Sequence, residues 1–344
     1  MIEIQSPSSS IAAEWDAYVA TRENATLHHL SAWSTIAERA YDLRTRLLVA
    51  RAAPDAPVRG VLPLVTVPRP LGRYLTTGLF GAYGPVLADD AVIARELLTV
   101  AQRTVEEDGA SYLHLKSLGE GPTPDGFQRY DHWVTAFLSL DGGAERVWHR
   151  FTGRIRTAVR VALRHELELR TGRDQLEPFY EVLAENMHRK GAPIYGRPFM
   201  ASLLDVLGPR ADVMTLWSGR TPISGALTIA YGNVMYVPFV SSVAAYFPLR
   251  PNNLLYWRII ERACSAGLGV LDFGTSLVGT STLRFKLGWG AVIHPAPSYV
   301  YARTSEPPTL TPDSASVRAG VALLKKLPRA VADLIGPSIS RLIV

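Results

Sequence analysis

The chain runs through the same order of secondary structure twice, and this repetition limits its possible folds more than any other feature. Apolar stretches of strand length alternate with amphipathic stretches of helix length on both sides of a break at Asp141–Gly143. Strands that alternate with helices form a sheet covered by helices, because each element has an apolar face to bury. With 344 residues the chain can build two such sheets, each with its own core. We therefore predict two α/β domains.

Each half contains its own set of expected elements. In the first half we expect helices over 10–20, 29–41 and 91–108 and strands over 45–52, 60–67, 111–117 and 133–140. In the second half we expect an arginine-rich helix after the break, helices over 176–190 and 252–266, and strands over 212–218, 223–231, 233–239, 269–273 and 298–302. The predicted division is 1–143, 144–304, and a linker with a helical tail over 305–344. Each sheet should be mixed and mostly antiparallel.

The composition is that of a globular protein, with 47% hydrophobic and 19% charged residues. No apolar run reaches the length of about 18 to 20 residues that a membrane-spanning helix needs. The opening MIEIQSPSSS lacks the basic and apolar parts of a secretory signal, so we expect a cytoplasmic protein. The single Cys264 excludes an intramolecular disulfide and a cysteine-based zinc site.

Familiar catalytic motifs are missing from the sequence. The eight histidines are scattered without HExxH spacing, and neither a GxSxG motif, a P-loop nor a GxGxxG after a strand occurs. The sequence therefore predicts no metal and no tightly bound cofactor.

The most distinctive motif lies between Leu271 and Gly290. A predicted strand ends at Asp272, a loop rich in Gly, Ser and Thr follows, and Arg284-Phe285-Lys286 come next. Backbone N–H groups in such a loop can bind a phosphate or an oxyanion. The alternative is a glycine-rich connection in which Asp272 accepts hydrogen bonds from nearby backbone groups. The residues alone leave both interpretations open.

This motif resembles the C-terminal signature of the Fem family of aminoacyl and acyl transferases. In that signature a strand ending in Asp-Phe-Gly or a similar triplet leads to an element with a Phe-Lys pair. The resemblance continues in Asn252–Trp257, in Lys190–Phe199 after the first long helix, and in the basic segment Arg154–Arg160. It is greatest toward members associated with exopolysaccharide and exosortase loci.

The resemblance implies two GNAT-like domains and a reaction in which an amine attacks an activated acyl group. The donor would be a co-substrate, either aminoacyl-tRNA or acyl-CoA. The Phe-Lys pair falls on Phe285 and Lys286, so Lys286 would stabilise a developing oxyanion or the phosphates of the donor, with Asp272 as the second catalytic residue. Thr275 and Leu277 stand where the nearest relatives usually carry Arg and Lys, which bears on the identity of the acceptor.

Ligand contacts should come from residues around this motif and from one loop of the first domain. The substrate-binding candidates are Tyr83, Tyr195, Arg197, Asn253, Tyr256, Trp257, Ser276, Arg284, Phe285 and Trp289. For most of the aromatic residues core packing is the alternative, with Tyr195 and Tyr256 as exceptions because each lies beside loop-forming residues. Tyr83 belongs to the loop Gly78–Pro85, which could also be a structural turn.

Arginines are concentrated at the start of the second half, in a chain whose net charge is +5 and whose pI is about 9.3. On a helix, six of them fall on one side: Arg146, Arg150, Arg154, Arg156, Arg160 and Arg164. They could form a solvated helix face. They could also bind phosphate on tRNA, a nucleotide or a pyrophosphoryl lipid through Arg154, Arg156 and Arg160, because guanidinium groups suit phosphate and few acids are nearby.

The tail from 317 to 344 is basic and apolar, and Pro328 and Pro337 should divide it into two or three short helices. Its apolar residues recur at three- and four-residue steps: Val317, Val321, Leu324, Leu327, Val331, Leu334 and Ile335. Two explanations compete. The stripe packs onto the body of the protein, or it lies in the headgroup region of the inner leaflet, where the basic residues attract anionic lipid.

Three hypotheses about function follow. The first is an N-acyltransferase acting on an amine of a cell-envelope, peptidoglycan or exopolysaccharide precursor, in the cytoplasm or peripherally at the inner face of the membrane. The second is acyl-CoA-dependent acylation of a small amine, which a run of backbone N–H groups at a helix start would favour. The third is a non-catalytic GNAT-like scaffold at the membrane surface, against which the retention of Phe285 and Lys286 argues.

Overall fold

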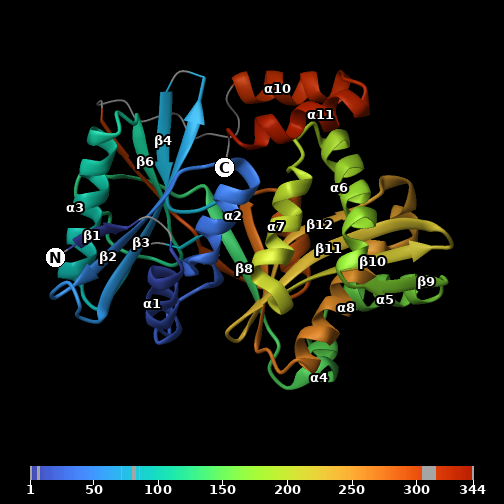
Figure 1. Cartoon of the computed structure of the whole chain (residues 1–344). Coiled ribbons are helices and arrows are strands. Elements are labelled where there is room, and N and C mark those ends of the chain that lie inside the picture. Colours follow the sequence, from blue (N-terminus) through green and yellow to red (C-terminus); the bar gives the residue numbers. More distant parts are fainter. Residues whose placement is uncertain are drawn as a thin grey trace. The chain divides into compact units, whose positions relative to one another are not determined.

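The computed structural model describes residues 2–5, 8–70, 72–79, 83–84, 86–303 and 315–342 (Figure 1). Two compact units result, each with a mixed sheet covered by helices. The predicted fold class, two α/β domains with a helical tail, is confirmed. No helix within the described residues is both long and apolar enough to cross a bilayer.

The first unit is built around a sheet with the strand order β1-β2-β3-β4-β6-β15-β7, and β5 pairs with β3. Its strands are β1 (Ile2–Gln5), β2 (Thr45–Arg51), β3 (Val58–Arg69), β4 (Gly72–Thr76), β5 (Leu87–Ala88), β6 (Tyr112–Lys116), β7 (Gln128–Tyr130) and β15 (Ser298–Ala302). Its helices are α1 (Ser9–Ala20), η1 (Leu27–His29), α2 (Ala32–Tyr41) and α3 (Ala91–Glu107). The amphipathic α3 connects the parallel strands β4 and β6 and buries Leu97 and Ala101 against Leu75 and Leu113.

The second unit is built around a sheet with the order β14-β8-β13-β12-β11-β10-β9. Its strands are β8 (Trp133–Ser139), β9 (Leu167–Thr171), β10 (Ala211–Ser218), β11 (Thr221–Tyr231), β12 (Val234–Ser242), β13 (Val270–Leu277) and β14 (Val292–Pro295). Its helices include α4 (Gly143–Arg150), α5 (Gly153–Leu163), α6 (Leu176–Lys190), α7 (Arg197–Leu207), α8 (Pro251–Ser265) and α9 (Ser281–Gly288), with short 3-10 segments η2 (Arg173–Gln175), η3 (Gly208–Arg210) and η4 (Ala244–Leu249). The core under α8 includes Leu255 and Ile259 with Met214 and Val159.

Close approach of α6 to this sheet depends on one glycine. A Cβ added at Gly225 on β11 would lie 2.7 Å from Cδ2 of Phe179 on α6, closer than side chains tolerate. The aromatic ring of Phe179 therefore packs directly on the strand.

Two expected elements of the second unit are corrected. The arginine-rich helix is interrupted, because Thr152 caps the start of α5 by accepting a hydrogen bond from the backbone N–H of Ile155. The segment 190–199, expected as a loop, leads directly into α7, with Pro198 in the first turn where a missing N–H costs nothing.

The compact units also divide the chain differently from the expected boundaries near 143 and 304. Among the described residues, the first unit holds those up to Trp133 and the segment 295–303, and the second holds Val134–His294 with the tail up to Ser340. The reason lies in two strands. β8 pairs within the second sheet, whereas β15, expected in the second domain, pairs with β6 and β7 of the first.

The tail forms two helices, α10 (Ala315–Lys326) and α11 (Arg329–Ser340), which pack beside α6 (Figure 1). The expected linker from Ser305 to 314 lies outside the described residues. The predicted apolar stripe is only partly buried, because the chain turns at Pro328 and the helical phase does not continue across it. Leu324 is buried, whereas Val331 and Leu334 are 41% and 79% exposed.

Candidate active site

The parallel pair β12–β13 loses its pairing partway along its length. The register joins Val234–Tyr236 to Val270–Asp272 and ends there, although β12 continues to Ser242 and β13 to Leu277. Backbone groups of both strands beyond this point are therefore not used by the β12–β13 ladder. Asp272 is the last paired residue of β13, which places its side chain where the ladder ends.

Asp272 is buried, with 1% of its surface exposed, and accepts hydrogen bonds through its carboxylate. Its Oδ1 accepts from the Thr135 hydroxyl on β8 and from the backbone N–H of Gly274, both at 2.8 Å. The bond from the Gly274 N–H is the one expected from the alternative interpretation of the motif, in which Asp272 accepts hydrogen bonds from nearby backbone groups. Gly274 has φ +73°, a conformation that favours glycine. The local backbone therefore explains why a glycine ends the Asp-Phe-Gly triplet.

Lys286 reaches back from α9 to β13. Its ammonium donates to the carbonyl oxygens of Gly274 at 2.6 Å and Thr275 at 3.0 Å, and only 5% of the residue is exposed. Burial lowers the pKa of Lys286 to about 8, although the negative charge of Asp272 acts in the opposite direction. An ammonium has three N–H donors, so one remains beyond the two carbonyl bonds.

The expected open loop after Asp272 is wrong. β13 continues to Leu277, and α9 begins four residues later with Thr280 as its N-cap. Two backbone donors at this turn are already used, because the N–H of Leu283 binds the Thr280 hydroxyl and that of Arg284 binds the Thr280 carbonyl. These two N–H groups are therefore not available to a phosphate.

Aromatic rings surround the base of α9. Tyr256 lies 5.1 Å from Phe273, 5.5 Å from Phe285 and 5.9 Å from Trp289, measured between ring centroids. Tyr256 is 3% exposed, and burial raises the pKa of its hydroxyl, so the structure packs its ring in the core, the alternative weighed for the other aromatic residues.

Two buried polar atoms near this motif have no hydrogen-bond partner within the described chain. They are the hydroxyl oxygen of Ser276 on β13 and the indole Nε1 of Trp289. Leaving such groups unpaired costs about 1 to 3 kcal/mol each, which a ligand or water can offset. Both residues were expected to bind substrate, and these atoms are the strongest structural reason to keep that expectation.

The other candidates on α8 and α9 are placed less centrally. Trp257 is 8% exposed, and its ring packs at a tilt against that of Trp148, with 4.8 Å between the centroids, as a core residue would. Asn253 lies in the first turn of α8 and is partly exposed. Arg284 is exposed on α9 and donates to the Gly279 carbonyl at 3.2 Å. The structure thus brings Asp272, Lys286 and the aromatic rings together and leaves Arg284 at the surface.

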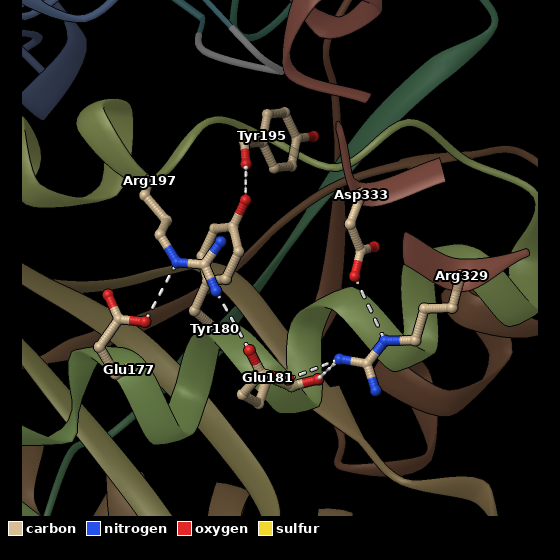
Figure 2. Close-up of polar contacts among 7 residues, drawn as sticks. All are labelled: Glu177, Tyr180, Glu181, Tyr195, Arg197, Arg329 and Asp333. Atoms are coloured by element: carbon tan, nitrogen blue, oxygen red, sulfur yellow. Dashed lines mark hydrogen bonds and ion pairs between the residues drawn. The ribbon is translucent and has the colours of Figure 1, made fainter. Parts of the chain in front are cut away.

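Tyr195 and Arg197 belong to a separate group on α6 and α7 (Figure 2). The Tyr180 hydroxyl donates to the Tyr195 carbonyl at 2.7 Å, and Arg197 forms 3.1 Å ion pairs with Glu177 and Glu181. The guanidinium also lies 4.1 Å from the ring centre of Tyr180. These contacts give Arg197 a structural role in joining the start of α7 to α6.

The arginines predicted to bind phosphate differ in their surroundings. Arg156 donates to the backbone carbonyls of His149 at 3.1 Å and Phe151 at 2.6 Å, so it fastens α5 to the end of α4. Arg154 and Arg160 are exposed, and the Arg160 guanidinium lies 5.7 Å from the ring centre of Trp148. Only the exposed pair retains the expected access to a phosphate.

In the first unit, Tyr83 is buried, with 2% exposure, and its ring meets that of His28 edge-on at 4.9 Å. The loop Gly78–Pro85 lies partly outside the described residues. Sequence reasoning missed Thr135, which donates to Asp272, because the two are far apart in the chain and no local pattern marks a single threonine on a strand.

A known protein family matches the part of the chain that contains Asp272 and Lys286. Residues 149–286 match the family model described as an acetyltransferase (GNAT) domain. The match lies within the second unit, and the prediction of an acyltransferase is supported by it.

Solved structures resemble the chain over most of its length. FemX matches with a TM-score of 0.66 at 15% identity, covering 87% of this chain and 97% of FemX. L-PGS from Bacillus licheniformis matches with a TM-score of 0.56 at 11% identity, covering 96% and 98%. A tandem GNAT protein from the clavulanic acid biosynthesis pathway matches with a TM-score of 0.56 at 10% identity, covering 89% and 100%. The predicted resemblance to the Fem-like transferases is confirmed at the level of the fold. No curated protein sequence matches the chain significantly.

Proposed function

We propose that the chain transfers an aminoacyl or acyl group from an activated donor to an amine of a cell-envelope, peptidoglycan or exopolysaccharide precursor. The observation that carries this proposal is the Lys286 ammonium, held against β13 beside Asp272 at the point where the β12–β13 ladder ends. A positive charge in a partly dry site stabilises the oxyanion that forms when an amine attacks an acyl carbon.

In this proposal the residues divide the work. Lys286 offers its third N–H to the developing oxyanion. Asp272 acts as a positioning residue, because its attraction favours the charged form of Lys286 and its carboxylate holds the Gly274 turn. Ser276 and Trp289 contribute the unpaired hydroxyl and indole N–H to substrate binding.

The donor is either aminoacyl-tRNA or acyl-CoA. The start of α8 gives little support to a donor whose pyrophosphate sits on helix N–H groups. Pro251 has no N–H, and the N–H groups of Asn253 and Leu254 both donate to the Arg250 carbonyl. Exposed Arg154 and Arg160 fit a phosphate-bearing donor such as tRNA.

A second candidate is acyl-CoA-dependent acylation of a small amine. The GNAT match over residues 149–286 favours it. The test is a donor panel in which purified protein is incubated with radiolabelled acyl-CoAs or with charged tRNA and an envelope-precursor amine. Transfer from charged tRNA to the precursor supports the first candidate, and transfer from acyl-CoA to simple amines alone supports the second.

Peripheral contact with the inner leaflet through 317–344 is a further part of the proposal. The support is the exposed apolar residues Val317 and Leu323 on α10, 46% and 60% exposed, beside the basic Lys325 and Lys326. Full-length protein should co-sediment with anionic but not neutral vesicles, and Leu323→Ser should weaken this. Equal recovery with neutral and anionic vesicles would show that the basic residues play no part.

A further inference from the structure

A cluster of basic side chains lies on one face of the first sheet, where the parallel pair β4–β6 ends. His114 and Lys116 are two residues apart on β6 and therefore point to the same face. The intervening Leu113 and Leu115 point the other way and join the core beneath α3. His114 and Lys116 thus occupy the face away from α3, and both keep part of their surface exposed.

Lys116 has no acidic partner among the described residues. Its ammonium donates to the Gly78 carbonyl at 3.2 Å, and no carboxylate in the described chain forms an ion pair with it. Burial alone lowers the pKa of Lys116 to about 8. A buried ammonium without an anion is unfavourable, because the lost hydration is not replaced by an opposite charge.

His114 contributes a second buried polar group, whose hydrogen-bonding capacity the described residues do not satisfy. Its ring Nε2 is buried and has no hydrogen-bond partner within the described residues. Burial and, to a smaller extent, the positive charges of Lys116 and Arg69 together lower the pKa of His114 to about 3. Lys116 acts on the pKa of His28 in the same direction, after burial and His29, so both rings lie within electrostatic reach of the ammonium.

Arg69 adds a second cation near His114. Its guanidinium lies over the rings of Tyr74 and Tyr112, at 4.6 and 5.3 Å from their centres. The cluster therefore combines two cations with ring N–H groups and contains no carboxylate in the described chain. A metal ion would be repelled by these cations, whereas an anion would satisfy them.

We propose that Lys116 and His114 form a binding site for a phosphate group, built from residues of the first unit alone. A tetrahedral oxyanion accepts several hydrogen bonds at once and brings the negative charge that Lys116 lacks. The phosphate could be free in solution or carried by a phosphorylated substrate, because both present the same oxygens. The site does not depend on the proposed acyl transfer.

Isothermal titration of the full chain with inorganic phosphate, pyrophosphate and acetate tests this directly, at constant ionic strength. The variants are Lys116→Met and His114→Gln, with Arg220→Met, an exposed cation in the turn between β10 and β11, as the matched control. Lys116→Met keeps the volume of the side chain and removes an unpaired buried charge, so it should fold at least as well as the wild type.

We expect saturable binding of phosphate or pyrophosphate to wild type and Arg220→Met, weakened at least about tenfold in Lys116→Met. Binding should also take up protons at pH 8, because an anion raises the pKa of Lys116, and buffers of different ionisation heat reveal this uptake. Tighter binding of pyrophosphate than phosphate would point to a phosphorylated substrate, and equal binding to the free ion. No saturable binding, unchanged affinity in Lys116→Met, or acetate binding as tightly as phosphate would each overturn the proposal.

Discussion

The Lys286 ammonium donates to the Gly274 carbonyl over 2.6 Å, and this bond joins α9 to the end of β13. A second bond, to the Thr275 carbonyl at 3.0 Å, makes the lysine a cross-link between the two elements. A residue of this kind serves the fold as well as the chemistry, and its substitution should affect both.

Replacing Lys286 with Ala should therefore lower stability as well as abolish transfer. From the sequence alone, a partly exposed lysine would leave the melting temperature nearly unchanged, but the structure shows 5% exposure. Two buried carbonyls would lose their donor, at a cost of about 1 to 3 kcal/mol each. Thermal unfolding should show a lower Tm for Lys286→Ala, while Lys326→Ala on α10 leaves it unchanged. A Tm equal to that of the wild type would mean that the two carbonyl bonds contribute nothing.

The free energy of unfolding should depend on pH through the ionisation of Lys286. Its folded-state pKa of about 8 lies below its ordinary value of 10.5. Between these values the unfolded lysine binds more protons than the folded one, so stability rises with pH across that window. Lys286→Met removes this term and leaves the equivalent contribution of Lys116 in place. The difference in free energy of unfolding, wild type minus Lys286→Met, should grow from pH 8 to 10.5, whereas wild type minus Lys326→Met stays constant.

The arginines of α5 should separate into two classes. Arg154→Glu and Arg160→Glu remove exposed charges and should weaken tRNA binding, with a shallower dependence on salt and an unchanged Tm. Arg156→Ala removes the donor to two carbonyls and should instead lower the Tm, because it loosens the α4–α5 connection. If Arg156→Ala leaves the Tm unchanged while the double reversal leaves tRNA binding intact, this division of roles is wrong.

The docking of the tail onto the second unit rests on Gly336. A Cβ added there would lie 2.8 Å from Cγ2 and 2.9 Å from the backbone N of Ile194. A side chain can rotate away from such a contact, but a backbone atom cannot move without shifting the chain. Gly336→Ala should therefore loosen α11 and raise proteolysis of the tail. Gly320→Ala on α10, with nothing within 4 Å, is the matched control and should stabilise its helix by about 1 kcal/mol. Equal proteolysis of the two variants would contradict this packing.

An ion-pair chain supports the same docking. Arg329 on α11 pairs with Glu181 at 2.6 Å and with Asp333 at 3.3 Å, and Glu181 also pairs with Arg197 (Figure 2). These groups are partly exposed, so we expect Arg329→Gln to cost less than about 1 kcal/mol in urea unfolding. A cost well above this would mean that the chain acts as a network rather than as separate pairs.

The sequence predicted most helices and strands because their apolar spacing is regular, as in α6 and α8. It could not assign β15 to a sheet, since the apolar pattern of Ser298–Ala302 reports burial and not the identity of the neighbouring strand. β9 was missed because its short, charged alternation continues the arginine-rich segment before it.

The candidate site was predicted in part. The strand that carries Asp272, the glycine after Phe273 and the Phe-Lys pair were visible in the sequence, whereas the strand end expected at Asp272 was wrong. The extension of β13 to Leu277 and the return of Lys286 to its carbonyls depend on tertiary contacts, which no local pattern encodes. Tyr256 was expected to contact ligand because Asn252 and Asn253 precede it, yet the helix turns its ring into the core.

The central claim is that the Lys286 site performs acyl transfer. The most direct measurement is single-turnover transfer of a radiolabelled acyl group to a precursor amine, for wild type, Lys286→Met and Lys326→Met, below the Tm of all three. We expect wild type and Lys326→Met to transfer at the same rate. Lys286→Met should be slower by at least about a hundredfold, because removing one hydrogen-bond donor to an oxyanion lowers the rate by about that factor. A Lys286→Met rate equal to that of the wild type, from the same donor, would contradict the claim.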